Sequence, residues 1–325
     1  MRMEQPVSLV KDPDDIKLAM LGWVDNNHHP YSWSAIFNGD FDDDAMAQCG
    51  CPPVPDYLNA NRDALGIDGA RVTHVWADDP DLAVHLSRAS LIPHVVERPE
   101  DVIGHVDAVL IPTDRGYEHL ERARPFIEAG LPVFIDKPLT DREDHLEQFV
   151  RWHNEGKQFM SCSGLRYSEY YEACRARLHE VGEMRVITCA ICKSWESYGI
   201  HVAEGVYPFL EPGGWLSTTN TGTKAANIVH ARHARGVDVI FQVVEDIGGA
   251  NGALTVLGTD GWLTAQHISN FLSFKIMFSK FVEYLRTGQP PFPFEQTIEL
   301  MKLIIAGTRS REEGGRTVKL SEIKA

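Results

Sequence analysis

Apolar and polar positions follow two different patterns along the chain, and the change falls near residue 165. Before it, short apolar runs alternate with segments of helical spacing. The clearest apolar runs are residues 16–21, 72–76, 106–111 and 132–136. Between the last two, Leu120, Ala123 and Ile127 recur at helical spacing, and Gly130 follows as a helix stop. Strand, helix and strand in this order form a βαβ crossover, which predicts a parallel sheet.

The same alternation continues beyond residue 136. Thr140 and Glu143 have the spacing of a capping box, which predicts a helix start, and residues 159–163 predict a last strand. Residues 38–60 fit neither pattern. They contain a run of aspartates and a proline-rich segment, which predict an inserted loop.

Period-two alternation dominates the second half. It predicts long strands over residues 183–195, 226–232, 237–244, 253–257 and 262–266, followed by helices over residues 274–286 and 295–309. The predicted fold class is α/β: a doubly wound parallel sheet of the Rossmann type at residues 14–165, then an α+β domain with an open, mainly antiparallel sheet at residues 166–325.

Length and composition agree with two globular domains. The chain has 325 residues, of which 43% are hydrophobic. Its formal net charge of −15 argues against nucleic acid or an anionic membrane as a partner. Residues 1–15 lack the apolar core of a signal peptide, and six scattered cysteines lack zinc-ribbon spacing. We therefore expect reduced thiols and a cytoplasmic location.

Candidate chemistry gathers where the predicted strands end. Ligands of open α/β sheets bind at the carboxyl ends of the strands, and Asp78, Thr113, Asp136 and Lys137 all follow such strands. Pro138 favours an extended backbone at Lys137, which can aim the ammonium group into a crevice where burial would lower its pKa. The local pattern fits a surface lysine in a loop equally well.

Several motifs in order resemble one known family. Residues 107–140 contain Thr113, His119 six positions later, and Asp136-Lys137-Pro138 after a strand. With Arg166-Tyr167 and the tail over residues 281–320, they resemble the Gfo/Idh/MocA oxidoreductases, which are related to glucose–fructose oxidoreductase and inositol dehydrogenase. The family has Glu-Lys-Pro where this chain has Asp-Lys-Pro. The resemblance covers most of the chain after about residue 100.

The resemblance implies a nicotinamide cofactor, a sugar or polyol substrate, and catalysis by Lys137 and His201. Residues 197–204 match the family pattern Asp-x-Gly-x-His-x-x-Asp, with Glu204 for the last acid and Ser197 for the first. Glu196 or Tyr198 is the expected replacement partner of His201, which we place between a strand and a helix, at a rim suited to a general base. The expected substrate-binding residues are Arg166, Tyr198 and Glu204. A homodimer or homotetramer is also implied.

The loop after the first strand departs from the usual dinucleotide fingerprint. Instead of G-x-G-x-x-G it reads Gly22-Trp23-Val24-Asp25-Asn26-Asn27, so only the first glycine remains. Either the loop is rearranged, with Asn26, Asn27 or a protonated histidine in place of the glycine amides, or dinucleotide binding is weakened. Adjacent His28 and His29 lack metal-ligand spacing, so we expect no metal.

The predicted function is an NAD-dependent oxidoreductase that acts on a secondary alcohol or ketone of a sugar, sugar acid or cyclitol. Asp78 favours NAD by binding ribose hydroxyls, and NADP is not excluded. The predicted cofactor-binding residues are Gly22, Val24, Asp25, Asp78, Thr113, His119, Asp136 and Lys137. Two alternatives stay open. One is an NAD-retaining lyase, hydrolase or epimerase with transient oxidation, and the other is a non-enzymatic ligand sensor.

Overall fold

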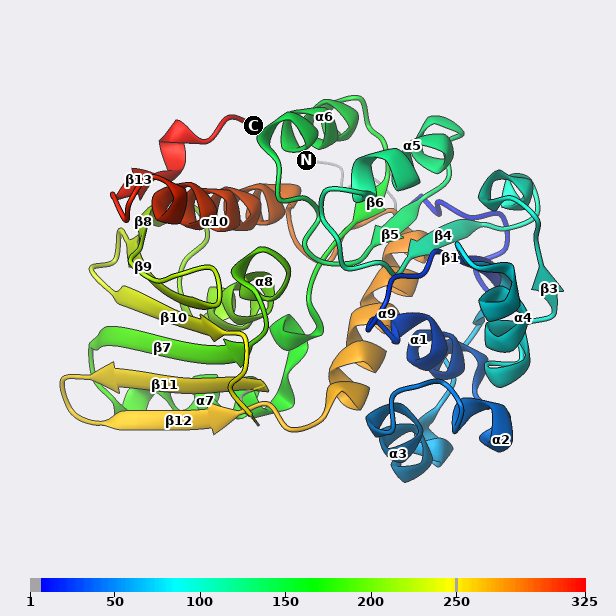
Figure 1. Cartoon of the computed structure of the whole chain (residues 1–325), viewed down its shortest axis with the longest axis horizontal. Helices are drawn as coiled ribbons and strands as arrows, with labels where there is room; N and C mark the ends of the chain where they lie inside the picture. The colour runs from blue at the N-terminus through cyan, green and yellow to red at the C-terminus, as the bar shows by residue number, and fades with distance from the viewer. Residues whose placement is uncertain (1–6, 249–250) are drawn as a thin grey trace.

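Two sheets form the framework of the molecule, and helices pack against each of them (Figure 1). The structure is a computed structural model that describes residues 7–248 and 251–325. The first sheet belongs to the N-terminal half and the second to the C-terminal half. Short 3₁₀ helices connect the elements at Arg62–Ala64, Pro99–Val102, Gly164–Tyr167, Leu178–Glu180, Tyr207–Phe209 and Leu320–Glu322.

The first sheet has six parallel strands in the order β3-β2-β1-β4-β5-β6. They are β1 (Ile16–Leu21), β2 (Ala70–Trp76), β3 (His94–Val95), β4 (Ala108–Ile111), β5 (Val133–Ile135) and β6 (Phe159–Met160). The order reverses between β1 and β4, and such a switch point opens a crevice at the carboxyl ends of the two strands. This sheet confirms the doubly wound part of the predicted fold class.

Helices cover both faces of this sheet because successive side chains of its strands point to opposite sides. On β1, Leu18 and Met20 join one hydrophobic cluster, whereas Ala19 and Leu21 join the other. The first cluster includes α1 (His29–Asn38) and α4 (Pro80–Ala89), and the second includes α5 (His119–Glu128) and α6 (Glu143–Asn154).

A helix from the C-terminal half completes the first of these clusters. Helix α9 (Asn270–Thr287) carries Phe278, whose ring centroid lies 4.8 Å from that of Trp33 and 5.3 Å from that of Phe134. All three aromatic side chains are buried. The chain therefore returns to the first sheet after building the second.

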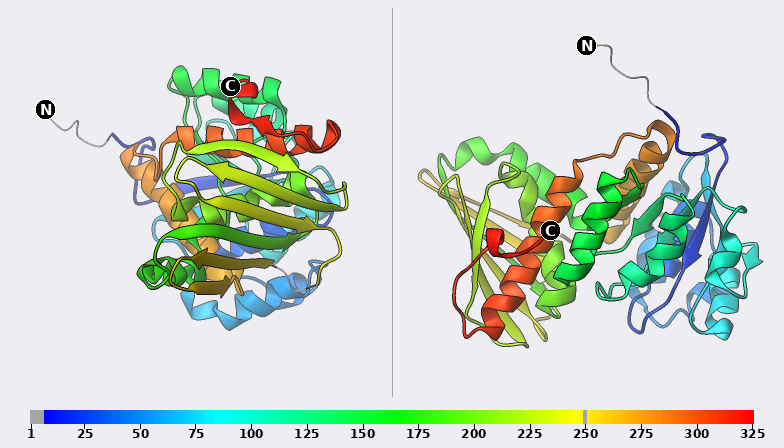
Figure 2. Two further views of the ribbon diagram at one scale, coloured as in Figure 1. Left: turned by 90° about the vertical axis from the view of Figure 1, so that its left-hand side faces the viewer. Right: turned by 90° about the horizontal axis from the view of Figure 1, so that it is seen from above.

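The second sheet has seven strands in the order β12-β11-β7-β10-β9-β8-β13. They are β7 (Met184–Cys192), β8 (Trp215–Asn220), β9 (Ala226–His233), β10 (Asp238–Val244), β11 (Asn251–Gly258), β12 (Trp262–Gln266) and β13 (Val318–Lys319). Only β7 and β10 pair in parallel, so the sheet is mainly antiparallel, as predicted. Helices α7 (Glu169–Ala176), α8 (Trp195–Val206) and α10 (Phe294–Glu312) cover one face, and Figure 2 shows the other face uncovered.

Two local predictions were wrong. Residues 38–60 contain helices α2 (Asp43–Met46) and α3 (Pro53–Ala60), because Asp42 caps α2 by accepting from the Ala45 N–H at 2.8 Å and Pro53 suits a first helical turn. Thr140 does not cap α6: its hydroxyl accepts from the Arg142 N–H at 3.1 Å, before the helix begins. No helix in the described ranges is long and apolar enough to cross a membrane.

Candidate active site

The site lies at the carboxyl ends of the first sheet's strands, where α8 of the second half approaches them. Lys137 follows β5 and is 1% exposed. Its Nζ atom lies 3.8 Å from Asp114 Oδ2 and 4.7 Å from the centroid of the Tyr198 ring. Among the described residues, this buried nitrogen has no hydrogen-bond partner. The ammonium group can therefore donate to a ligand oxygen.

The electrostatics of Lys137 differ from the expectation. Burial alone would lower the pKa of this side chain, but Asp136 and Asp114 outweigh burial and raise the pKa above its ordinary value. The expected lowering of the pKa was wrong because it considered burial without the charges of Asp136 and Asp114. Lys137 is therefore a fixed cation and a hydrogen-bond donor at neutral pH.

His201 lies on the opposite wall of the site, inside α8. We predicted a position between a strand and a helix, and this was wrong. Strand β7 ends at Cys192 and α8 begins at Trp195, so His201 lies within the helix. The His201 ring lies 4.8 Å from the Tyr198 ring, so one tyrosine contacts both His201 and Lys137. Burial, and then the charge of Lys137, lower the pKa of His201 well below its ordinary value. The imidazole is therefore neutral at neutral pH and can accept a proton.

Ser163 is the polar partner of His201, and sequence reasoning missed it. Its Oγ lies 2.6 Å from His201 Nδ1 and also accepts from the Leu165 N–H at 3.1 Å. Glu196, one expected partner, instead pairs with Arg311. Ser163 follows β6 at the sheet edge that holds Lys137, and this position was the one signal that could have identified it.

Asp136 connects Lys137 to the loop that follows β1. Its Oδ1 accepts from the Lys137 N–H at 2.8 Å, and its Oδ2 lies 2.7 Å from His29 Nδ1. The His29 ring stacks on Trp33 with 4.4 Å between centroids. Asn27 donates from Nδ2 to Pro112 O at 2.7 Å, which holds the loop against the end of β4. Asp136 and Asn27 therefore hold the loop after β1 against the ends of β4 and β5.

The loop after β1 keeps one tight approach of the backbone. Gly22 has a φ of +117°, and a Cβ there would lie 3.0 Å from Thr113 Cγ2 and 3.3 Å from Arg122 Nη1. Asn26 has a φ of 64°, the left-handed conformation that glycine and asparagine adopt most readily. Val24 is buried and Asp25 is exposed. The loop is therefore rearranged around Gly22.

Asp78, the predicted ribose ligand, already has hydrogen-bond partners within the protein. It accepts from the Trp23 N–H at 3.0 Å and forms two bonds with Arg122, at 2.9 and 3.2 Å. Arg122 also donates to Glu118 at 2.9 Å. In the sequence, Arg122 and Glu118 look like an ordinary i,i+4 surface pair, which is why the Asp78 contact was missed.

His119 and Thr113 are both fully buried. His119 Nε2 lies 2.7 Å from Thr113 O, and Nδ1 lies 2.8 Å from Pro138 O, so His119 joins the turns after β4 and β5. Both ring nitrogens of His119, a predicted cofactor-binding residue, thus lie at hydrogen-bond distance from main-chain carbonyl oxygens. The Thr113 hydroxyl has no partner within the described residues.

Arg166 and Glu204, both predicted to bind substrate, pair with each other. Arg166 Nε donates to a Glu204 carboxylate oxygen, and Nη1 donates to Gln296 Oε1 at 2.8 Å. Their side chains are only 8% and 2% exposed. Burial raises the pKa of Glu204, with Arg166 partly offsetting it. Of the three predicted substrate residues, only Tyr198 lies directly against Lys137 and His201.

These residues fit a dinucleotide better than a metal ion. The strand order, the tight approach at Gly22 and the partnerless polar atoms of Thr113 and Lys137 suit such a ligand. The start of α1 offers fewer amides than a glycine loop, because the Asn27 side chain accepts from the His29 N–H at 2.9 Å and Pro30 has none. Within the described part, no three His, Cys, Asp or Glu side chains are arranged to hold a metal ion.

The fold and the site define a dinucleotide-type α/β domain joined to an open-faced α+β domain, and solved structures share this architecture. Scyllo-inositol dehydrogenase from Lactobacillus casei is 14% identical, with a TM-score of 0.74 over 96% of this chain and 100% of that one. Myo-inositol 2-dehydrogenase from Lactobacillus plantarum is 14% identical, with a TM-score of 0.72 over 94% and 99%.

An oxidoreductase from Agrobacterium radiobacter, solved with NAD+, L-tartaric acid and magnesium, is 13% identical, with a TM-score of 0.69 over 95% and 99% of the two chains. No protein-family model and no curated protein matches the sequence. The predicted fold class and the resemblance in fold to these dehydrogenases are thereby confirmed.

Replacing Glu204 by Gln should lower the free energy of unfolding by about 3 kcal/mol, because it leaves the Arg166 guanidinium buried without its counter-charge. Urea unfolding measures this loss. The control is Glu180→Gln, which removes one partner of an exposed pair with Arg177 and should cost less than about 1 kcal/mol. Equal losses in the two variants would contradict the buried pairing.

Proposed function

We propose that the chain is an NAD(P)-dependent oxidoreductase that acts on the secondary alcohol of a sugar, sugar acid or cyclitol. One observation carries this proposal: at the carboxyl edge of the first sheet, a buried lysine that has no hydrogen-bond partner among the described residues and a histidine contact the same tyrosine ring. The fold shared with inositol dehydrogenases supports the class of reaction.

The dinucleotide would lie over Gly22 and Val24, with its adenosine end near Asp78 and its nicotinamide end near Thr113 and Lys137. When bound, the nicotinamide ring supplies the hydride acceptor. Asp25 is exposed on the same loop, where water screens its charge from a phosphate. His119 and Asp136 act as positioning residues, because both are buried and bound to neighbouring turns or to the loop after β1.

His201 and Lys137 share the work on the substrate hydroxyl. Ser163 can accept the Nδ1–H of His201, which leaves Nε2 free to take the hydroxyl proton. Lys137 donates a hydrogen bond to the same oxygen as negative charge develops on it. Their environments raise the pKa of Lys137 and lower the pKa of His201. His201 is therefore the base, and Lys137 is the hydrogen-bond donor.

Two ammonium groups give the substrate side a positive character. Lys193 donates from Nζ to the Tyr198 hydroxyl at 2.6 Å, and Lys137 lies against the same ring. Asp114 Oδ2 lies 3.8 Å from Lys137 Nζ. Burial would raise the pKa of Asp114, but the charges of Lys137 and His29 hold this pKa below its usual value. A sugar acid therefore belongs in any substrate panel beside neutral sugars and cyclitols.

Lys137→Met should reduce turnover about 10³-fold while largely sparing nucleotide affinity, because the oxygen loses its donor but the nucleotide contacts elsewhere remain. Tryptophan fluorescence measures NAD and NADP binding, and nicotinamide absorbance measures turnover across the substrate panel. Lys224→Met, at an exposed position, is the control. Nucleotide released on denaturing the purified protein would identify a retained cofactor. Unchanged turnover in Lys137→Met, or no nucleotide binding at all, would refute the proposal.

The acid limb of kcat/KM should lie below pH 6.5, the ordinary pKa of histidine. Because the folded-state pKa of His201 is depressed, the ring stays neutral as the pH falls through 6.5 and becomes protonated only further down. Rates measured between pH 5 and 8 locate this limb. His201→Asn should remove it along with most of the activity. An acid limb at or above pH 6.5 in the wild-type enzyme would count against His201 as the base.

We also infer that copies of the chain associate through the uncovered face of the second sheet. It exposes Leu216, Ile228, Leu257 and Trp262, which are 52%, 40%, 40% and 66% accessible. Exposed apolar side chains gathered on one sheet face favour contact with another protein surface. Ile228→Glu with Trp262→Glu should convert a homodimer or homotetramer into a monomer, as measured by light scattering. A wild-type monomer at micromolar concentration would contradict this inference.

A further inference from the structure

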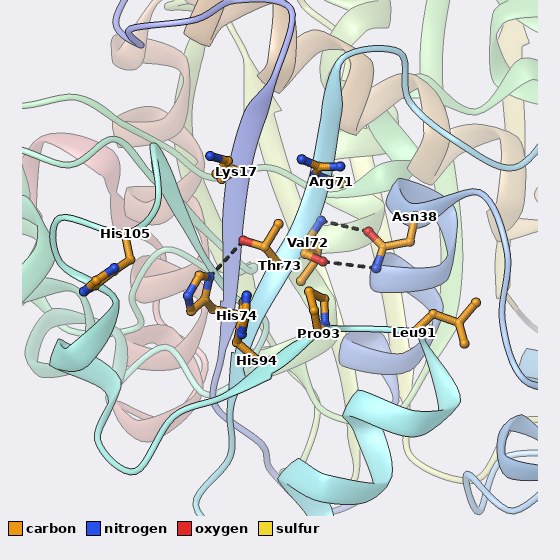
Figure 3. A pocket seen from close by; sticks show the side chains of 10 residues that line it. All are labelled: Lys17, Asn38, Arg71, Val72, Thr73, His74, Leu91, Pro93, His94 and His105. Atoms are coloured by element: carbon orange, nitrogen blue, oxygen red, sulfur yellow. Dashed lines mark hydrogen bonds between the residues drawn. The ribbon is translucent and has the colours of Figure 1, made fainter.

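A hollow of about 800 Å³ lies beside β2 (Figure 3). It forms because β3 is only two residues long and pairs with His74 and Val75 alone. Further back along β2, the Asn38 side chain bonds both main-chain groups of Val72, at 2.8 and 3.1 Å. An amide side chain thus replaces a neighbouring strand and leaves open space next to it.

Basic side chains line this hollow, although the chain as a whole is acidic. Figure 3 shows Lys17 and Arg71 on one side and three histidines on the other. Its polar lining also includes a threonine hydroxyl, and the residues concerned are Lys17, Arg71, Thr73, His74, His94 and His105. No acidic residue is among the lining residues. Five basic groups thus meet in one place on a molecule whose formal net charge is −15.

Nearby acids neutralise only part of this charge. Asp15 lies 2.9 Å from Arg71 and 3.9 Å from Lys17, so one carboxylate serves two cations. Asp107 accepts from the Lys17 main-chain N–H at 2.9 Å. Within the described part of the chain, the rings of His94 and His105 make no hydrogen bond. Their N–H groups remain available to a ligand.

The histidines are close enough to interact. The His74 ring lies 4.7 Å from that of His94 and 6.2 Å from that of His105, and its Nδ1 lies 2.8 Å from Thr73 Oγ1. Burial, followed by the charges of His94 and His105, lowers the pKa of His74. Protonated rings at this spacing repel each other, and an anion between them would remove the repulsion.

Other ligand classes fit this hollow poorly. A transition metal needs ligand atoms within about 2.3 Å of one point, and the described residues contain no such group of side chains. Nucleic acid is disfavoured by the net charge. What remains is a small anion. Phosphate presents three or more acceptor oxygens to donors that surround it, whereas a carboxylate presents two on one side.

We propose that this hollow binds a small molecule through a phosphate group, with Arg71, Lys17 and the histidines as donors. The site is separate from the candidate active site, because Lys17 precedes Gly22 by five residues of extended chain, roughly 16 Å at about 3.3 Å per residue. The proposal does not depend on the proposed redox reaction.

Calorimetric titration of the full chain with inorganic phosphate and with glycerol phosphate at pH 6.5 tests it. Both probes should bind, and the tighter one shows whether the natural ligand is free phosphate or a phosphate ester. Arg71→Gln and His94→Gln should each weaken binding at least tenfold. Histidine NMR signals should shift on titration for His74, His94 and His105.

Matched controls separate this site from general charge effects. His230→Gln and Arg232→Gln change a histidine and an arginine on the second sheet, whose side chains are 43% and 65% exposed, and should leave affinity unchanged. Nucleotide affinity and thermal unfolding should be unaffected by Arg71→Gln and His94→Gln, which would show that the fold and the dinucleotide site are intact. The proposal is overturned if phosphate affinity is the same in all variants, if malonate binds as tightly as either phosphate probe, or if neither probe binds.

Discussion

The buried charge of Lys137 is the constraint around which this edge of the first sheet is organised. An ammonium group taken out of water needs negative charge and acceptors for its protons. Asp136 and Asp114 supply the charge, but no acceptor among the described residues completes the hydrogen bonding. Asp136 in turn contacts His29, so the same charge also places the loop after β1. The Lys137 ammonium group therefore lacks a hydrogen-bond acceptor at the place where a ligand oxygen could supply one.

The charge of Lys137 also determines the state of its neighbour. An ammonium group near His201 disfavours protonation of the imidazole, and burial acts in the same direction. Tyr198 separates the two groups while contacting both. The proposed reaction needs one group that removes a proton and another that stabilises the oxygen left behind, and two groups with similar pKa values would exchange these roles with pH.

Continuous apolar runs made β1, β4 and β5 predictable, because parallel strands covered on both faces have no polar side. Strand β3 was missed because its two residues are exposed, and β8 because it is rich in Ser, Thr and Asn. In β8, Asn220 is held by α10, where Ser310 Oγ accepts from the Asn220 N–H at 2.8 Å and Gly307 O accepts from the Asn220 side-chain amide at 3.2 Å. Such compensation comes from residues distant in sequence and leaves no local pattern.

The site shows the same division. Short motifs around Lys137 and His201 were enough to propose both as catalytic residues. Ser163 lies 38 positions before His201, and His29 lies 107 positions before Asp136, so only the completed fold brings these pairs together. The same long connections affect the order of folding. Because α9 supplies aromatic side chains that Trp33 and Phe134 pack against, the N-terminal half leaves the ribosome with one sheet face only partly covered, by α1 and α4. That face stays a target for chaperones or aggregation until residue 287 has been made.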